Sequence, residues 1–371
     1  MRFAIGHLAK NSKARTGTLA TAHGIIETPV FMPVASNGSV KSLPIWELEK
    51  LGATMILGNT YHLHLRPGEE NIAQAGGLHK WLTWDKPILT DSGGYQAFSL
   101  GTTRAKIAKT NDDGVKFASH LDGRKLEFTP ESVLDIQLKL GSDIVMVLDD
   151  CPPFPASEVR LRQAVSRTTD WAKRSLTHWQ KQAVGERGVF GIIQGGGDRH
   201  LRRQSLDEIQ NLPFDGLAIG GVSVGEGKEQ MNEAVESVAT EIDPNRPRYL
   251  MGVGEPIDLI QSIGRGIDMF DCVLPTRLAR HGAFWVKDSY RRLDIRRSEF
   301  ATDRAPLDDD CVCSTCQRFG RDYLRHLFVT GDPVAGTYLT IHNLRLYFSL
   351  IDQIRQAIKA NNFDQKFSKF I

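Results

Sequence analysis

The sequence contains few cysteines for its length, and its N-terminus has no long apolar run. Five cysteines in 371 residues, three of them within CVCSTC at 311–316, do not make the disulfide framework of a secreted protein. The first residues, MRFAIGHLAKNSKARTG, lack an apolar segment long enough for a signal peptide or a membrane span. We therefore expect a cytoplasmic protein with no membrane partner.

The sequence also lacks an excess of one charge, internal repeats and low-complexity segments. Lysine and arginine number 46 against 44 aspartates and glutamates, a formal net charge of +2, so any nucleic-acid site must be a local basic patch. The charged fraction of 24% and the apolar fraction of 41% are ordinary for a globular protein. The length allows one large barrel domain or two domains of average size.

Eight short apolar runs recur along the chain, each ending in glycine, aspartate or another polar residue. Nearly continuous apolar strands are typical of a parallel sheet that is covered on both faces, and helix-period segments lie between most of the runs. Eight such units predict a (β/α)8 barrel of the TIM type, an α/β fold, rather than an open doubly wound sheet. The runs are TPVFMPVA (28–35), ATMILGN (53–59), PILTDSGG (87–94), DIVMVLDD (143–150), VFGIIQGG (189–196), GLAIGG (216–221), RYLMGVG (248–254) and IDMFDCVL (267–274).

The chemistry of a barrel collects at the C-terminal ends of its strands. Several polar residues and glycines of this chain fall at those ends, and we expect them to converge in space although they are scattered in the sequence. They are Asp91, Asp149, Asp150, Gln194, Gly220, Gly221, Gly252 and Asp271.

Two segments do not fit the repeating unit. Residues 98–129 include VKFASHLDGRKLEF, two alternating runs around Asp122 and Gly123, which predict an inserted β-hairpin. Residues 284–345 carry the cysteine cluster ahead of a last helix at roughly 343–360. We therefore divide the chain into a barrel at 1–283, including an N-terminal extension and the hairpin, a metal-binding insertion at 284–345, and a C-terminal helix at 346–371 that packs on the barrel.

The cluster C-x-C-x2-C places Cys311, Cys313 and Cys316 on one turn. Three thiolates at this spacing suit tetrahedral zinc, which needs a fourth ligand, and His326 and His342 are both candidates by spacing. Reactive or merely buried cysteines are the alternative, although three unpaired thiols in six residues would oxidise readily. A closed site of this kind is structural and stabilises a segment that lacks its own core.

The stretch MFDCVLPTRLARHG, 269–282, places one carboxylate, Asp271, inside an apolar strand just ahead of Arg277 and Arg280. An aspartate within a strand is unfavourable unless it is paired or functional. From these residues alone, an aspartate–arginine ion pair that fixes a loop and a functional carboxylate are both open.

Several motifs occur together and in order, and the chain resembles a tRNA-guanine transglycosylase of the bacterial type, a family also called queuine tRNA-ribosyltransferase. The resemblance implies a zinc-bearing (β/α)8 barrel, typically a homodimer. It also implies an enzyme that replaces guanine at the wobble position of GUN-anticodon tRNAs with a 7-deazaguanine base. The motifs are TDSGGYQ (90–96), GIIQGG (191–196), IGGVSVGE (219–226), LMGVGEP (250–256), FDCVLPTRLARHG (270–282), and the cysteine cluster followed by TIHN (340–343).

The resemblance also implies roles for single residues. Asp271 matches the nucleophile that attacks C1′ of the ribose, and Asp91 matches the general acid/base, a pair of carboxylates as in retaining glycosidases. Asp149 matches the acceptor for the guanine N1–H and amine, and Gln194 and the Gly221 N–H match donors to its O6. Tyr95 matches a residue that stacks on the base, although alone it could be a core aromatic. The implied base-binding set is Asp91, Ser92, Gly93, Gly94, Tyr95, Asp149, Cys151, Gln194, Gly220, Gly221, Val222, Met251 and Gly252.

Cys151 and Val224 match bacterial members, which favours the prequeuosine base, 7-aminomethyl-7-deazaguanine, over queuine. Asp150 and Val222 depart from the common bacterial residues, glutamate and leucine. His342, in TIHN, becomes the fourth zinc ligand. Arg318, Arg321 and Arg325 add positive charge in the insertion. The implied RNA-binding residues are Gly252, Val253, Gly254, Glu255, Pro256, Ile257, Asp258, Thr276, Arg277, Leu278, Ala279 and Arg280.

Other functions are compatible with the same fold. A member that uses queuine or an archaeosine precursor would share most motifs, and a non-catalytic RNA-binding homologue would lack one of the carboxylates. A carbohydrate glycosidase on the same barrel would need neither TRLAR nor a zinc site.

Overall fold

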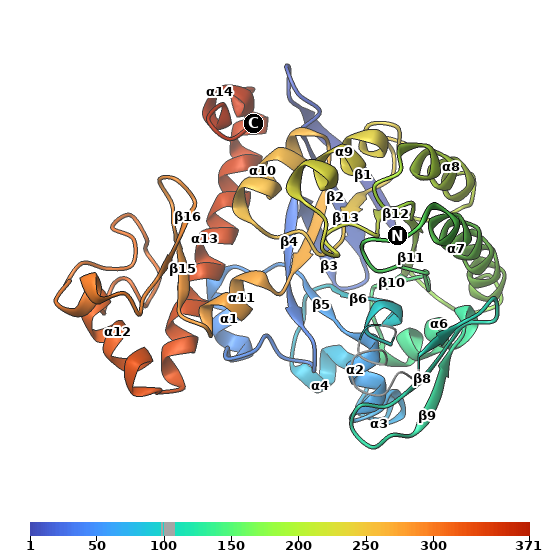
Figure 1. Ribbon diagram of the computed structural model, residues 1–371, viewed down its shortest axis with the longest axis horizontal. Helices are drawn as coiled ribbons and strands as arrows, with labels where there is room; N and C mark the ends of the chain where they lie inside the picture. Colours follow the sequence, from blue (N-terminus) through green and yellow to red (C-terminus); the bar gives the residue numbers. More distant parts are fainter. Residues whose placement is uncertain (98, 100–107) are drawn as a thin grey trace.

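The computed structural model describes residues 1–97, 99 and 108–371, and its centre is a closed barrel of eight parallel strands (Figure 1). The predicted (β/α)8 barrel is therefore confirmed, because each of the eight apolar runs contains one barrel strand. The last barrel strand closes on the first, with Met269 opposite Val30 and Cys272 opposite Pro33. In chain order the strands are β4 (Val30–Ala35), β5 (Ile56–Gly58), β6 (Ile88–Thr90), β10 (Ile144–Met146), β11 (Gly188–Ile193), β12 (Gly216–Ile219), β13 (Arg248–Leu250) and β14 (Met269–Cys272).

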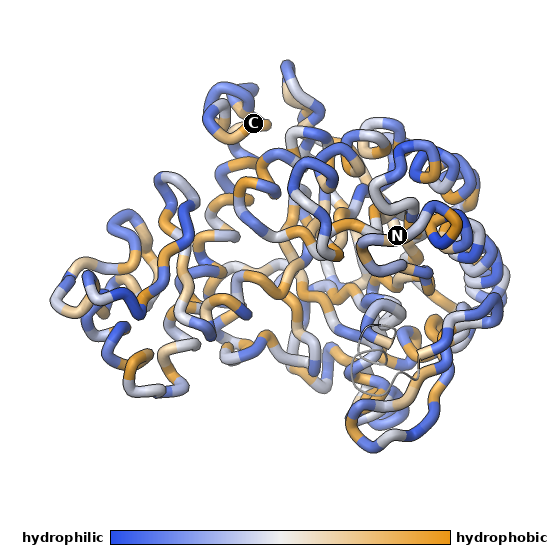
Figure 2. Tube along the Cα trace, viewed as in Figure 1, coloured by the Kyte–Doolittle hydropathy of each residue, from blue (hydrophilic) through white to orange (hydrophobic). Residues whose placement is uncertain are grey.

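Helices surround the barrel, and Figure 2 shows that the outer sides of the long helices are mostly hydrophilic. Apolar residues of these helices, such as Trp171, Leu176 and Leu206, are buried. Local signals set their ends: Thr129 caps α6 by accepting from the Ser132 N–H at 3.1 Å, Pro130 is its first residue, and Gly141 ends it at a φ of 80°. The helices of the barrel region are α1 (Ile45–Leu51), α2 (Thr60–Leu65), α3 (Glu69–Gln74), α4 (Gly77–Leu82), α6 (Pro130–Leu140), α7 (Glu158–Trp179), α8 (Arg199–Gln210), α9 (Lys228–Ala239), α10 (Pro256–Gly264) and α11 (Leu274–Ala279).

An antiparallel sheet of β1 (Arg2–Leu8), β2 (Arg15–Thr21) and β3 (Gly24–Thr28) lies at the end of the barrel where the strands begin. Arg15 forms a bidentate ion pair with Asp268, through Nε at 2.9 Å and Nη2 at 2.6 Å, just before β14. Asp268 also accepts from the backbone N–H of Arg248 at 2.8 Å. Arg15 and Asp268 are 3% and 0% exposed, so a buried ion pair holds the sheet onto the barrel.

The predicted hairpin is present around Asp122 and Gly123. β8 (Val115–Ala118) pairs antiparallel with β9 (Lys125–Phe128), and the short β7 (Lys109–Thr110) adds a third strand. Residues 98 and 100–107 of the predicted insertion lie outside the described residues.

The C-terminal part lies beside the barrel (Figure 1) and consists of the pair β15 (Ala283–Val286) and β16 (Arg291–Asp294), η1 (Ser298–Ala301), α12 (Arg321–Thr330), α13 (Val334–Lys359) and α14 (Phe363–Phe367). The last long helix begins at Val334 rather than near residue 343. Its first turns contain Gly336, Thr340 and Ile341, which have low helix propensity and hid the start of the helix. α13 packs against α11, β15 and β4, so it links the cysteine-bearing segment to the barrel.

None of the helices in the described residues combines the length with the apolar character that crossing a lipid bilayer requires.

We expect Asp268→Ala to lower the free energy of unfolding by about 3–5 kcal/mol, because it leaves the buried Arg15 without its partner. The measurement is denaturant unfolding of wild type and variant. The exposed pair of Asp294 with Arg296, 2.6 Å apart, is the matched control, and Asp294→Ala should cost no more than about 1 kcal/mol. Equal losses in the two variants would contradict the assignment.

Candidate active site and metal centre

A pocket of about 180 Å³ opens at the C-terminal ends of the barrel strands. It gathers most of the residues that the resemblance assigned to the base, together with Asp271 and Val224. Gly94 and Gln194 do not line it: Gly94 packs against Leu148, and Gln194 lies fully buried behind Asp149. The lining residues are Leu57, Asp91, Ser92, Gly93, Tyr95, Gln96, Asp149, Cys151, Gly220, Gly221, Val222, Ser223, Val224, Tyr249, Met251, Gly252 and Asp271.

Asp91 is held at the end of β6 by the start of α2. Its carboxylate accepts from the Asn59 side-chain amide at 2.5 Å and from the Thr60 N–H at 2.9 Å. Burial, with the nearby charge of Asp271, raises the pKa of Asp91 to about 7, although the bonds from Thr60 and Asn59 oppose this shift. Asp91 can therefore both hold and release a proton near neutral pH, as an acid/base catalyst must.

Asp271, at the end of β14, receives both of its donors on the same oxygen. The Tyr249 hydroxyl donates to Oδ1 at 2.6 Å, and the Gly252 N–H donates to it at 2.9 Å. Burial raises the pKa of Asp271, while these two hydrogen bonds act in the opposite direction. Within the described residues neither Arg277 nor Arg280 pairs with it, so the ion-pair interpretation of this aspartate is wrong.

Asp149 and Asp150 follow β10 but face different surroundings. Asp149 lines the pocket and accepts from the Gln194 amide at 2.6 Å, and burial raises its pKa to about 6. Asp150 is clamped by Arg160, at 2.8 and 2.5 Å, and by Arg167, at 2.5 Å, both on α7. Asp150 is therefore not part of the pocket wall, and its departure from the common glutamate lies outside the base site.

Tyr95 and Cys151 were also predicted to line the pocket, and both do. Tyr95 is 44% exposed, so it is a rim residue available for stacking and not a core aromatic. Burial and the carboxylates of Asp149 and Asp150 raise the pKa of Cys151 to about 12. Cys151 is therefore a neutral thiol that shapes the pocket and is not a nucleophile.

The segments matched to RNA binding lie beside the pocket, but many of their side chains face inward. Thr276 and Ala279 of α11 are buried, as are Val253 and Asp258. Arg277 is exposed at the mouth, and Arg280 donates to the Thr276 carbonyl at 2.9 Å. In the insertion, Arg321 is likewise occupied within the protein, by an ion pair with Asp303 at 2.9 Å. The side chain of Arg277 can therefore contact a ligand, whereas those of its buried neighbours Thr276 and Ala279 cannot.

The cysteine cluster forms a compact group with His342 of α13. The ligand atoms of Cys311, Cys313, Cys316 and His342 all lie within 4.8 Å of one another, so one tetrahedral ion fits among them. The His342 Nε2 lies 2.8 Å from the Trp285 carbonyl, which fixes the N–H there and leaves Nδ1, 3.2 Å from Cys316 Sγ, as the ligand. His326 is exposed on α12, away from this group. This donor set is compatible with zinc.

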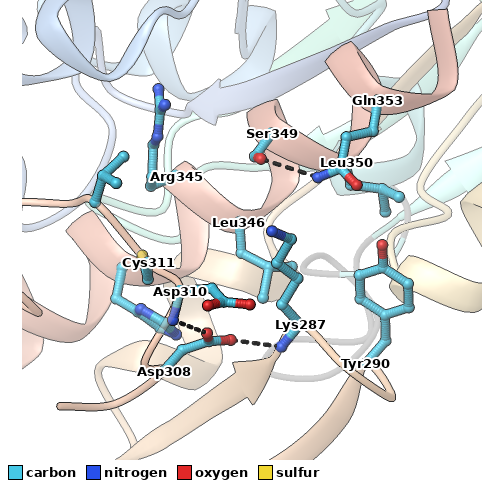
Figure 3. A pocket seen from close by; sticks show the side chains of 12 residues that line it. Lys287, Tyr290, Asp308, Asp310, Cys311, Arg345, Leu346, Ser349, Leu350 and Gln353 are labelled. Atoms are coloured by element: carbon cyan, nitrogen blue, oxygen red, sulfur yellow. Dashed lines mark hydrogen bonds between the residues drawn. The ribbon is translucent and has the colours of Figure 1, made fainter. Parts of the chain in front are cut away.

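A small pocket of about 40 Å³ lies beside this group (Figure 3), where Cys311 and Asp308 are among its lining residues. Asp308 accepts from the Lys287 N–H at 2.6 Å and from the Asp310 N–H at 3.2 Å, which orders the loop ahead of the cysteines. The small pocket therefore lies between this loop and α13, beside the cysteine cluster.

A second group, His23, His79 and Asp143, lies at the opposite end of the barrel and could also hold an ion by distance alone. The two rings are stacked, with centroids 3.5 Å apart and planes 11° apart, and their nitrogens face the two oxygens of Asp143. An ion between parallel rings would lie outside both ring planes, where the nitrogen lone pairs do not point. The arrangement is a hydrogen-bonded contact that joins β2–β3 to β10.

Sequence reasoning missed Tyr249 and Asn59, which hold the two pocket carboxylates. A tyrosine within RYLMGVG resembles an ordinary strand residue, so nothing in the sequence pointed to its hydroxyl. Asn59 carried a weak signal, because an asparagine just before a helix is a typical N-cap, and it accepts from the His62 N–H at 3.0 Å.

The mouth of the closed barrel holds two carboxylates, Asp91 and Asp271, with different hydrogen-bond partners. Such a site defines an α/β-barrel enzyme that works by nucleophilic and acid–base chemistry. The family model described as queuine tRNA-ribosyltransferase matches residues 10–371 of this chain. The chain therefore belongs to the queuine tRNA-ribosyltransferase family.

Related proteins are similar over nearly their whole length, and each carries the name queuine tRNA-ribosyltransferase. The protein of Nitratidesulfovibrio vulgaris is 50% identical, over 96% of this chain and 93% of its own length. That of Acinetobacter baylyi is 47% identical, over 98% and 92%, and that of Dictyoglomus turgidum is 46% identical, over 98% and 92%.

Proposed function

We propose that this protein exchanges guanine at the wobble position of tRNAs with a GUN anticodon for a 7-deazaguanine base. The observation that carries the proposal is the pair of unlike carboxylates in one pocket. Asp271 has one oxygen occupied by two donors and the other available, whereas Asp91 has a pKa near 7. A base exchange without net hydrolysis needs one carboxylate of each kind. Family membership supports the same assignment.

In the first half of the reaction the free oxygen of Asp271 attacks C1′ of the ribose. The bond from C1′ to N9 of guanine breaks, and its electron pair goes to the purine, which takes a proton from Asp91. The ribose is then joined to Asp271 as an ester. Tyr249 and Gly252 hold the carboxylate so that it faces the sugar without rotating.

In the second half the incoming base gives its N9 proton to Asp91, and N9 attacks C1′. The ester bond breaks, and Asp271 leaves as a carboxylate. Two displacements at one carbon retain its configuration. A protein with this arrangement acts as an enzyme in its own right, which argues against a non-catalytic RNA-binding homologue.

Recognition of the base follows from the groups around the pocket. Asp149 accepts from the N1–H and the exocyclic amine, the Gly221 N–H donates to O6, and Tyr95 stacks on the ring. Gln194, which the resemblance matched to O6, instead holds Asp149 from behind through its amide at 2.6 Å. Val222 and Val224 line the same pocket as Cys151. Glu226 accepts from the N–H groups of Ser223 and Val224, which fixes this turn. We infer that the Val222 carbonyl receives the aminomethyl group of the prequeuosine base.

The tRNA must turn its wobble base out of the anticodon stack before the base can enter the pocket. Arg277 and the backbone of residues 252–254 at the mouth are the groups we assign to the phosphates. Buried Thr276 and Ala279 support this surface from below. We further infer a homodimer in the cytoplasm, as the resemblance implies.

We assign zinc to Cys311, Cys313, Cys316 and His342. The ion would join the loop that carries the cysteines to α13, in a segment with little core of its own. The four side chains would fill all four positions of a tetrahedral ion and leave none open for a substrate or water, so we assign it a structural role.

The proposal predicts that wild type incorporates radiolabelled guanine into unmodified tRNA with a GUN anticodon, and that Asp271→Asn abolishes incorporation because its amide cannot attack C1′. The measurement is acid-precipitable label with time. Unchanged incorporation by Asp271→Asn, or none by wild type, would contradict the proposal. Competition by prequeuosine base more effectively than by queuine tests the assigned base.

The pKa values predict a rate maximum between pH 6 and pH 7 in kcat/KM for tRNA and guanine. Asp91 loses its proton as the pH rises through about 7, which removes the general acid. Asp149 gains a proton as the pH falls through about 6, which removes the acceptor for guanine. A profile that is flat from pH 5 to pH 9 would refute these two roles.

Zinc analysis tests the metal assignment. We expect His342→Ala to lose zinc and to melt at a lower temperature, because three cysteines alone leave the tetrahedral site incomplete. His326→Ala is the matched control and should retain zinc. The reverse result would show that the ligand set is wrong.

A further inference from the structure

Arg202 is a buried arginine of α8 without an ionic partner in the described residues. Its side chain is 0% exposed. Nε donates to the Gly196 carbonyl at 2.6 Å and Nη2 to the Gly221 carbonyl at 3.0 Å, while Nη1 has no hydrogen-bond partner in the part of the chain that the structure describes. Burial lowers the pKa of Arg202 to about 10, so it stays charged at neutral pH. A buried charge held only by carbonyls is unfavourable for folding, and the mechanism above does not use it.

The two carbonyls belong to glycine turns that flank the base pocket. Gly196, with a φ of +57°, follows Gln194, and Gly221, with a φ of +62°, lines the pocket itself. A Cβ at Gly221 would lie 2.3 Å from Gln194 Oε1 and 3.7 Å from Arg202 Nη2. Arg202, Gln194 and Gly221 therefore pack as one layer beneath the pocket, in which only glycine allows the close approach.

This layer connects to the residue that reads the base. The Gln194 amide donates to Asp149 at 2.6 Å, and Gln194 Oε1, like Arg202 Nη1, has no hydrogen-bond partner among residues 1–97, 99 and 108–371. The contacts run from the arginine through the Gly221 peptide and Gln194 to Asp149. Any shift of the Gly196 and Gly221 turns would displace the groups that face the guanine edge.

We propose that Arg202 is a positioning residue for base recognition. It fixes the Gly196 and Gly221 carbonyls, so that the Gly221 N–H and Asp149, which Gln194 holds from behind, are kept in place for the guanine edge. Its charge also stabilises the purine as it departs. When the bond from C1′ to N9 breaks, the electron pair makes the purine anionic until Asp91 supplies the proton, and a fixed cation beneath the ring favours that charge. This inference rests on the proposed function.

Two variants test the proposal. Arg202→Met keeps the length of the stem but removes the charge and both donors, whereas Arg202→Lys keeps the charge and loses the planar fork. Direct loss of a preorganised donor typically lowers kcat about 100- to 1,000-fold, so we expect at least about a tenfold loss for a residue one layer further away. We expect Arg202→Met to raise the Kd for guanine by calorimetry about tenfold and to lower kcat. Arg202→Lys should fall between Arg202→Met and wild type. The KM for tRNA should stay within about twofold, because the RNA surface is untouched.

Arg248 provides a matched control at the opposite end of the barrel. It is 5% exposed, donates through Nη2 to the Ile242 carbonyl at 2.7 Å, and also has a guanidinium nitrogen without a partner. Arg248→Met should lower the melting temperature as Arg202→Met does, yet leave the guanine Kd unchanged.

Guanine binding and kcat within about twofold of wild type in Arg202→Met, or the same change in Arg248→Met, would overturn the proposal. If Arg202→Met does not accumulate as folded protein, Arg202→Lys decides, and a wild-type Kd in that variant overturns it. Failure of wild type to exchange guanine would instead overturn the proposed function. If wild type exchanges guanine and Arg202→Met keeps the wild-type guanine Kd and kcat, only the role of Arg202 is overturned.

Discussion

The burial of carboxylates at the mouth of the barrel is the constraint on which the site depends. An ionised carboxylate taken from water must find donors, and the identity of those donors decides how readily it binds a proton. Asp91 has an amide and a backbone N–H from the start of α2, whereas Asp271 has a tyrosine hydroxyl and a glycine N–H from the neighbouring strand end. The same residue type therefore serves two chemical roles in one pocket.

The two ends of the barrel have different roles: the end where the strands begin stabilises the fold, and the end where they finish carries the candidate active site. At the end where the strands begin, the carboxylates have firm partners: Asp268 is paired with Arg15, and Asp143 lies between two histidines. At the end where the strands finish, the carboxylates of the pocket have no cationic partner among the described residues, and burial raises the pKa of Asp91 and Asp149. The unpaired Arg202 lies beneath this second end, which is where an uncompensated cation can act on a substrate.

Much of the architecture could be predicted because eight apolar runs with polar ends permit few other folds. Asp91, Asp149 and Asp271 were placed in one pocket for the same reason, since strand ends meet at the barrel mouth. Asp150 shows the limit of that rule: consecutive residues beyond a strand face opposite ways, and two arginines of α7 hold Asp150 outside the pocket. Tyr249 and Arg202 were missed because their roles depend on contacts between distant elements, which no local pattern records. The start of α13 was missed because tertiary packing overrides the weak helix propensity of its first turns.

The central claim is that Asp271 forms a covalent bond to the ribose while Asp91 handles protons. The most direct measurement is to mix the protein with GUN-anticodon tRNA, denature it, digest both polymers and map the ribosyl adduct by mass spectrometry. The account predicts an adduct on the peptide that contains Asp271 in wild type when the second half-reaction is blocked, and less of the same adduct in Asp91→Asn, whose amide cannot give the departing purine its proton. An adduct on Asp91, or on any peptide without Asp271, would contradict it.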